Sequence, residues 1–360
     1  MKILYVSSWH SVLEYSDLEI FNTLDIDWFS TGCFLDPNNP RYYPGYEFKK
    51  NPLIASEKQL DFINSMLPFY VDNPQGYRSS VTLSKNFVNK FDIIIINNRE
   101  PNLDYVLNLN PRGKVIYRTY DYHSPRVETK IEDLKNDGRL EILRLFDWED
   151  DIEWSSKSNH CILSHVDENI YKEWSGEENQ ILTFCSNFDG KTRHRDPLYG
   201  IFPYRMANTT YKSIVENYNH RLHGHSNRSG HGPVDFNTQL ELYKKSRIYF
   251  NLSCPPAWHN YGLMEAMMTG CPTISFDEVL GGFNHPHYSN AFRLKTIIPN
   301  SNYGLVSDYT HEIVDYIEKL RSDHSFAKEV SENSRKQALK HFSKARAIKD
   351  WKNFVDIFKN

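Results

Sequence analysis

One stretch of the sequence combines a glutamate and glycines at the spacing of a ligand-binding helix. It runs from Asn260 to Ile274 (NYGLMEAMMTGCPTI). The pattern predicts a short loop, a helix with Glu265 in its first turn and a stop at Gly270, and then a strand opened by Cys271-Pro272. The start of this helix is the first place in the chain where a ligand is expected.

The start of a helix presents unpaired N–H groups and a partial positive charge, which together bind anions such as a diphosphate. Glu265 could then accept hydrogen bonds from ribose hydroxyls. The residues expected to surround the anion are Tyr261, Gly262 and Leu263. The alternative is an ordinary helix in which the acid only stabilises the helix dipole.

Three bases follow another predicted strand, Ile181–Phe184. They are Lys191, Arg193 and Arg195. Basic side chains at the end of a strand could offset the charge of a leaving diphosphate without a metal ion. They could also be plain surface residues.

Histidines and glycines gather between residues 223 and 232. The histidines are His223, His225 and His231. No acidic or thiolate ligand is interleaved with them, so we predict no metal site and instead a loop that lies beside a ligand.

In the first half of the chain, a strand over Val115–Tyr117 runs into a polar loop that contains Asp121 and His123. A strand-end carboxylate or imidazole could act as the general base that takes a proton from an attacking hydroxyl. Asp121 could equally cap a turn. Arg118 stands at the end of the same strand and is a candidate contact for the acceptor that carries this hydroxyl.

The loop after the first predicted strand, Ile3–Val6, offers a second set of groups. His10 is a rival general base, and Ser8 and Trp9 are expected to border the acceptor. The Trp9 ring could stack on a sugar or an exposed nucleobase, although an aromatic residue after a strand is also ordinary packing.

Short apolar runs alternate with amphipathic stretches, which predicts strands and helices wound into parallel sheets, an α/β fold. The all-apolar run Ile93–Ile96 predicts a central strand covered on both faces. Apolar residues at helical spacing predict helices over Glu312–Leu320 and at the C-terminus. The other predicted strands are Val115–Tyr117, Cys161–Leu163, Ile248–Leu252 and Thr273–Phe276. Because ligands of such sheets bind outside the carboxyl ends of the strands, the residues that follow each strand are the ones to examine.

The chain has 360 residues, of which 39% are apolar and 14% aromatic, and so has enough apolar material for two cores. A polar, Gly-containing stretch near Trp174–Asn179 predicts the boundary between them. Five cysteines without a CxxC pair argue against disulfides and a thiolate zinc site. We expect a cytoplasmic protein, since neither a membrane span nor a signal-peptide pattern is visible.

The run Gly262–Ile274, in the second half of a two-domain chain, resembles the donor site of glycosyltransferases with the GT-B architecture. The resemblance implies two Rossmann-like domains that face each other across a cleft. Residues 1–176 would bind the acceptor, residues 177–340 would bind a nucleotide-sugar, and the helix in residues 341–360 would pack on the first domain.

In that family the matching glutamate binds the ribose of the nucleotide-sugar, so the resemblance gives this role to Glu265. The start of the helix and nearby bases bind the diphosphate, and the histidine loop lies close to the base and the sugar of the donor. A UDP-sugar or another nucleoside-diphosphate sugar would be the donor, with no metal required. Many relatives carry an acid eight positions before the glutamate, where this chain has Ala257.

The segment Lys114–Arg126 also resembles the strand and loop with the catalytic aspartate of the bacteriophage DNA β-glucosyltransferases, and Lys344–Trp351 resembles their ending. This implies that Asp121 is the base of an inverting transfer to a hydroxymethylpyrimidine in double-stranded phage DNA, in the host cytoplasm. Two alternatives remain. One is a saccharide or lipid-linked acceptor in surface-polymer synthesis, and the other is a non-catalytic nucleotide-sugar-binding module. The net charge of −4 tells against DNA, because DNA binding depends on Lys and Arg.

Overall fold

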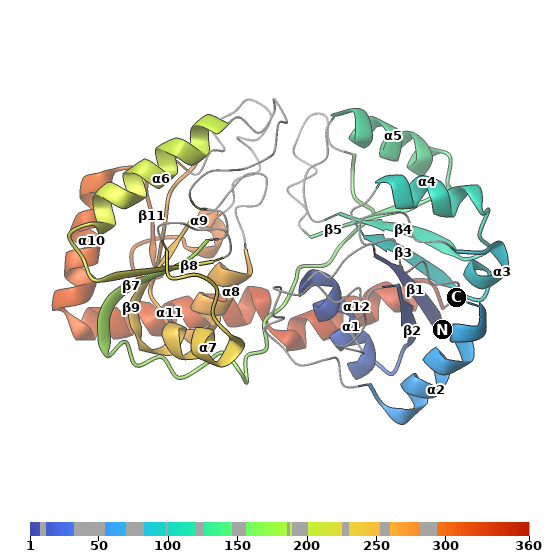
Figure 1. Cartoon of the computed structure of the whole chain (residues 1–360), viewed down its shortest axis with the longest axis horizontal. Helices are drawn as coiled ribbons and strands as arrows, with labels where there is room; N and C mark the ends of the chain where they lie inside the picture. The colour runs from blue at the N-terminus through green and yellow to red at the C-terminus, as the bar shows by residue number, and fades with distance from the viewer. Residues whose placement is uncertain are drawn as a thin grey trace. The chain divides into compact units, whose positions relative to one another are not determined.

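The computed structural model describes residues 1–7, 12–31, 55–69, 83–97, 100–119, 125–145, 156–185, 188, 201–224, 230–252, 260–280 and 294–359. The chain divides into two compact units, each described here by itself (Figure 1). Unit 1 comprises Met1–Ser164 and Ala347–Asn360, and unit 2 comprises His165–Arg346. The boundary expected at residue 176 therefore lies within unit 2. There the N–H groups of Ser175 and Gly176 both donate to the carbonyl of Lys244.

Unit 1 contains a parallel sheet with the strand order β2-β1-β3-β4-β5-β6. The strands are β1 (Lys2–Val6), β2 (Asp27–Ser30), β3 (Ile93–Asn97), β4 (Lys114–Arg118), β5 (Glu141–Arg144) and β6 (His160–Cys161). The helices are α1 (Val12–Thr23), α2 (Glu57–Met66), the 3₁₀ turn η1 (Leu67–Phe69), α3 (Lys85–Val88), α4 (Glu100–Asn108), α5 (Pro125–Asn136) and α12 (Lys344–Ile357), of which residues from Ala347 onward belong to this unit.

The isoleucine run forms β3, as predicted. Ile93, Ile94, Ile95 and Ile96 are all fully buried, and β3 pairs with β1 on one side and β4 on the other. A parallel strand in this position has helices over both faces, which explains why its residues do not alternate between apolar and polar.

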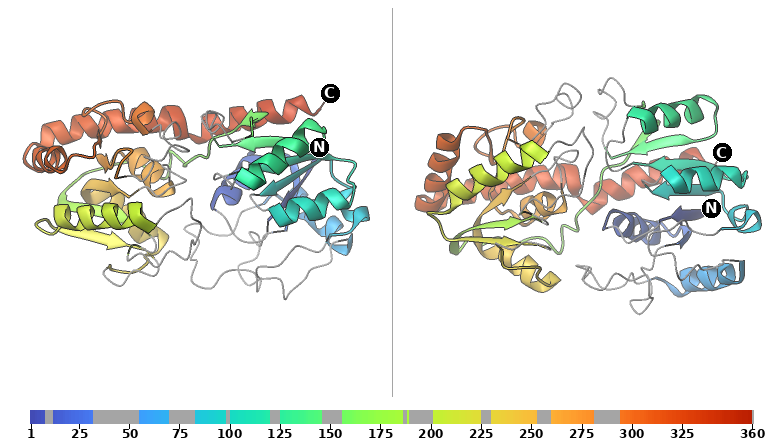
Figure 2. Two further views of the ribbon diagram at one scale, coloured as in Figure 1. Left: turned by 90° about the horizontal axis from the view of Figure 1, so that it is seen from above. Right: turned by 45° about the horizontal axis from the view of Figure 1, so that its top comes forward.

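Helices cover both faces of the unit 1 sheet (Figure 2). On one face the Trp351 ring of α12 meets the Phe21 ring of α1 edge-on, with 4.8 Å between centroids. The helices α4 and α5 are joined through Lys130, which binds both Glu100 and Asp104. The apolar stripe predicted at the C-terminus therefore belongs to the core of unit 1.

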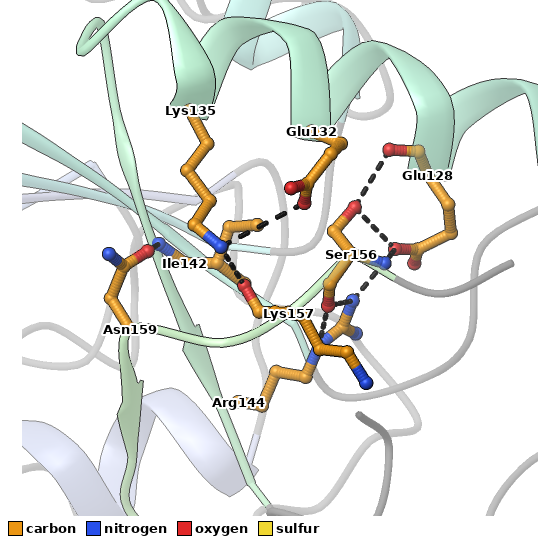
Figure 3. A network of polar contacts seen from close by, with 8 residues as sticks. All are labelled: Glu128, Glu132, Lys135, Ile142, Arg144, Ser156, Lys157 and Asn159. Atoms are coloured by element: carbon orange, nitrogen blue, oxygen red, sulfur yellow. Dashed lines mark hydrogen bonds and ion pairs between the residues drawn. The ribbon is translucent and has the colours of Figure 1, made fainter. Parts of the chain in front are cut away.

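Two strands of unit 1 end in buried arginines. Arg118 ends β4 and pairs with Asp17 of α1, with 2.7 Å between Nε and Oδ2. Arg144 ends β5 and pairs with Glu128 of α5, where Ser156 also donates to the carboxylate (Figure 3). All four charged side chains are at least 96% buried, and removing one member of such a pair is strongly destabilising because the other charge stays buried.

Unit 2 contains a second parallel sheet, in the order β11-β10-β9-β7-β8. Its strands are β7 (Glu178–Phe184), β8 (His220–His223), β9 (Ser246–Asn251), β10 (Thr273–Ser275) and β11 (Leu305–Val306). Its helices are α6 (Ile201–Val215), α7 (Phe236–Lys245), α8 (Tyr261–Thr269), α9 (Leu294–Ile297), α10 (Thr310–Ser322) and α11 (His324–Phe342).

The strand order of each sheet reverses once. In unit 1 the chain goes from β1 outward to β2 and then returns to β3, and in unit 2 it goes from β7 to β8 and returns to β9. Ligands of open parallel sheets bind at the carboxyl ends of the strands on either side of such a reversal. The ends of β1 and β3 and the ends of β7 and β9 are therefore the places to look for function.

Each predicted strand overlaps an observed one, although β6 shares only Cys161 with the strand predicted at Cys161–Leu163, and α10 and α12 confirm the predicted helices. Among the strands in the described residues, four were not predicted: β2, β5, β8 and β11. They are short, and three of them begin or end with charged or histidine residues, so their apolar pattern is weak. Among the described helices, none has the length and apolar composition of a membrane span.

Candidate functional site

The site in unit 2 begins at the start of α8, the helix that follows β9 on the side where the strand order reverses. Asn260 caps this helix, because its side-chain oxygen accepts a 2.8 Å hydrogen bond from the N–H of Leu263. The Asn260 amide also donates to Asn251, the last residue of β9, and Asn251 donates to Ser275, the last residue of β10. A row of polar side chains thus fixes the helix start to the ends of two strands.

Gly262 allows α8 to start against the sheet. A methyl group built at this position would lie 2.4 Å from the hydroxyl oxygen of Tyr249 in β9, which no real side chain tolerates. Tyr261 and Gly262 are partly exposed, whereas Leu263 is fully buried. The first two residues of the helix therefore lie nearer the surface, while the helix body packs into unit 2.

Glu265 lies one turn further along α8. The helix begins at Tyr261, so Glu265 is its fifth residue and lies just beyond the first turn in which it was predicted. Its side chain is 3% exposed, and its carboxylate accepts hydrogen bonds from other segments of the described chain. The donors include the Tyr171 hydroxyl at 2.8 Å, the Gln239 amide at 2.7 Å and the Tyr243 hydroxyl at 3.1 Å.

The tyrosines around Glu265 stay protonated. Burial, and then the charge of Glu265, raise the pKa of both Tyr171 and Tyr243 well above the usual value. Each hydroxyl therefore remains a donor to the carboxylate over the whole physiological range, and the cluster keeps one geometry.

His223 ends β8 on the same side of the sheet. Its Nδ1 lies 3.2 Å from the carbonyl oxygen of Gly232, and since a carbonyl can only accept, Nδ1 carries the proton. Burial lowers the pKa of this imidazole, so the ring is neutral at pH 7 and its Nε2 is an acceptor. The ring packs on Phe184, and Phe184 packs on Tyr243, which links His223 to the Glu265 cluster.

The histidine stretch does not form a metal centre where it is described. The rings of His223 and His231 lie side by side, with centroids 5.2 Å apart. Within the described part of the chain, no group of three or more histidine, cysteine or acidic side chains is arranged to hold a metal ion.

Arg118 has a different role from the predicted one. Its side chain is fully buried, with the guanidinium against Asp17 and the Trp351 ring, so it is not placed to touch an acceptor. Its position at the end of a strand suggested a ligand contact. The aspartate that neutralises it stands 101 residues away in the chain and could not be inferred from the strand pattern.

The other predicted residues lie outside the described ranges. These are the candidate bases Asp121, His123 and His10, the acceptor contacts Ser8 and Trp9, the basic residues Lys191, Arg193 and Arg195, and His225. Sequence reasoning missed Tyr171, Gln239, Tyr243 and Tyr249, for which no local motif gives a signal, because they reach α8 from other elements.

Comparisons with known proteins complete the description. No family model matches the chain, and no curated protein sequence matches it. Among solved structures, HepE of Anabaena in complex with UDP and glucose superposes with a TM-score of 0.64 at 13% identity over 99% of both chains. A glycosyltransferase from Rickettsia africae gives 0.61 at 12% identity, over 99% of this chain and 97% of the other. The β-glucosyltransferase of phage T4 gives 0.51 at 12% identity over 99% of both chains. The chain has the fold of the GT-B glycosyltransferases.

Proposed function

We propose that the protein is a glycosyltransferase that moves a sugar from a nucleoside-diphosphate sugar, with a UDP-sugar as the first candidate, to an acceptor hydroxyl. The observation that carries this proposal is the capped start of α8 at the strand reversal of unit 2. The same fold in HepE has been determined with UDP and with UDP-glucose. A helix start beside strand ends suits the diphosphate of such a donor.

The donor would lie along the carboxyl ends of the unit 2 strands. The N–H groups of Tyr261 and Gly262, two partly exposed residues, would meet the diphosphate, and Lys191, Arg193 and Arg195 would neutralise it as it leaves. Glu265 would contribute to the ribose side of the site. The acceptor atom of His223 would take a hydrogen bond from the base or the sugar, and His225 is a further candidate for this role.

The chemistry needs one proton acceptor on the other reactant. As the acceptor oxygen forms its bond to the anomeric carbon, the bond from that carbon to the diphosphate oxygen breaks, and the hydroxyl proton passes to a base. Asp121 would be this base, with His123 or His10 as replacements. Ser8 and Trp9 would line the acceptor.

Two classes of acceptor are considered, and each is supported by different observations. A hydroxymethylpyrimidine of DNA is favoured by the resemblance of the Asp121 segment to the phage enzymes and by the match to the T4 structure over 99% of both chains. A saccharide is favoured by the net charge of −4 and by TarM, a structure with a TM-score of 0.55 that was determined with UDP and alpha-GlcNAc-glycerol.

The test is incubation of the purified protein with a panel of labelled UDP-sugars, with and without hydroxymethylated DNA or oligosaccharides. Release of UDP that depends on an acceptor is the expected result. Donor binding without any turnover would favour a non-catalytic binding module. Salt separates the two acceptor classes, because affinity for duplex DNA falls steeply between low and moderate ionic strength and affinity for a neutral sugar does not.

A further inference from the structure

Glu14 occupies the strand reversal of unit 1. It lies in the first turn of α1, and its side chain is fully buried. The hydroxyl of Ser30, the last residue of β2, donates a 2.6 Å hydrogen bond to its Oε1. The side chains of Ser7, directly after β1, and of Asn97, the last residue of β3, also interact with this carboxyl group. One side chain thus joins the carboxyl ends of three adjacent strands.

The surroundings of Glu14 differ from those of the other buried acids of unit 1. Asp17 faces Arg118 of β4 and the Tyr5 hydroxyl of β1, and Glu128 faces Arg144. The groups that most influence Glu14 are neutral, and the nearby charge of Asp17 repels its ionised form. Burial raises the pKa of Glu14 from 4.5 to about 8, so the carboxyl holds its proton at pH 7.

A buried acid of this kind lowers stability. The folded state binds the Glu14 proton more tightly than the unfolded state does, so the free energy of unfolding falls as the pH rises from about 4.5 toward about 8. A glutamine would have nearly the same shape and would avoid this loss. Ionisable groups that are kept at a cost to stability are characteristic of functional sites.

We propose that Glu14 is a positioning residue of the acceptor side, which holds the ends of β1, β2 and β3 in one arrangement. Its ionisation favours local opening of these ends, because the charge is better solvated outside the buried site than inside it. This inference rests on the proposed function, in which unit 1 binds the acceptor through the loops that follow these strands. Glu14 itself is fully buried, so it acts through Ser7, Ser30 and Asn97 rather than by contact with the substrate.

Amide hydrogen exchange tests the positioning directly, in the full chain. The Ser7 N–H donates to the Thr31 hydroxyl at 2.8 Å, and the Thr31 N–H donates to the Tyr5 carbonyl at 3.0 Å, so both amides report on the strand ends. At about pH 9 we expect these amides to exchange at least ~10-fold faster in the wild type than in E14Q, and equally at about pH 6. Equal exchange in the two proteins at both values would overturn the proposal.

The pH dependence of the transfer rate provides the second measurement. With a UDP-sugar and acceptor, the activity of the wild type should decrease above about pH 8. At pH 7 the activity of E14Q should lie within about two-fold of the wild-type value, and it should not decrease above about pH 8. E57Q, which alters an exposed glutamate in the first turn of α2, is the matched control and should follow the wild type. If the activity of E14Q had the same pH dependence as that of the wild type, Glu14 would have only a structural role. If the wild type transferred no sugar at all while the exchange difference persisted, the proposed function would fail and the fixing of the strand ends by Glu14 would stand.

Discussion

The hydroxyl of Tyr171 donates a 2.8 Å hydrogen bond to Glu265 across 94 residues of sequence. With Gln239 and Tyr243 it surrounds a buried carboxylate with donors from other segments of unit 2. Such a cluster holds its geometry before any ligand arrives, which is what a binding site built on α8 requires.

Replacement of Glu265 by alanine should weaken both the donor site and the fold. Three buried donors would lose their acceptor, and the affinity for UDP should fall by about 1–3 kcal/mol, roughly five- to 150-fold. Titration calorimetry with UDP measures this loss, and urea unfolding measures the change in stability. E241Q, at an exposed glutamate of α7, is the control. Unchanged UDP affinity in E265A would show that the donor does not bind at α8.

Substitution of Gly262 by alanine should displace the start of α8. The added methyl group would press on the Tyr249 hydroxyl, and we expect a cost of about 1–3 kcal/mol together with weaker UDP binding. Removal of that hydroxyl makes room, so G262A/Y249F should recover part of both losses. A double-mutant cycle in UDP affinity measures the coupling, and strictly additive effects would argue against this contact.

Substitution of His223 by phenylalanine should lower UDP-sugar affinity without unfolding unit 2. Phenylalanine keeps the packing on Phe184 but removes both ring nitrogens, the acceptor Nε2 and the Nδ1 that donates to the Gly232 carbonyl, so urea unfolding must show that unit 2 keeps its stability. The loss of one hydrogen bond corresponds to about 0.5–1.5 kcal/mol of binding free energy. Because burial lowers the His223 pKa, the ring stays mostly neutral at pH 7, and wild-type affinity should stay level between about pH 8 and pH 7. Affinity equal in H223F and wild type would remove His223 from the donor site.

Substitution of Trp351 by alanine should destabilise unit 1 by about 3–5 kcal/mol. The indole is 1% exposed, packs against Phe21 and lies 5.1 Å from the Arg118 guanidinium. Urea unfolding measures this loss of stability, and hydrogen exchange of the β3 amides shows whether unit 1 is the unit affected. L339A, at an exposed leucine of α11, should change stability by no more than about 0.5 kcal/mol. A similar effect of both substitutions would contradict the assignment of α12 to the core of unit 1.

The sequence by itself determined the features that depend on residues close together in the chain. The run of four isoleucines specified the buried strand β3, because only a strand covered on both faces is apolar at every position. Gly270 specified the end of α8, since its φ of 94° is accessible to glycine without strain. The apolar spacing near the C-terminus specified α12 and the face that it buries.

Only the tertiary structure decided which polar groups meet. A pattern of apolar and polar residues records whether a side chain is buried, but not which distant segment lies against it. Glu265 receives its donors from residues 171, 239 and 243, and Arg118 is neutralised by Asp17 rather than exposed to an acceptor. Glu14 carries no motif, and its pKa is raised because the assembled sheet and helix bury it, although the side chains at the three strand ends lower it in part. These contacts form when the sheets assemble, and so the charge state and the partner of each buried group are properties of the fold.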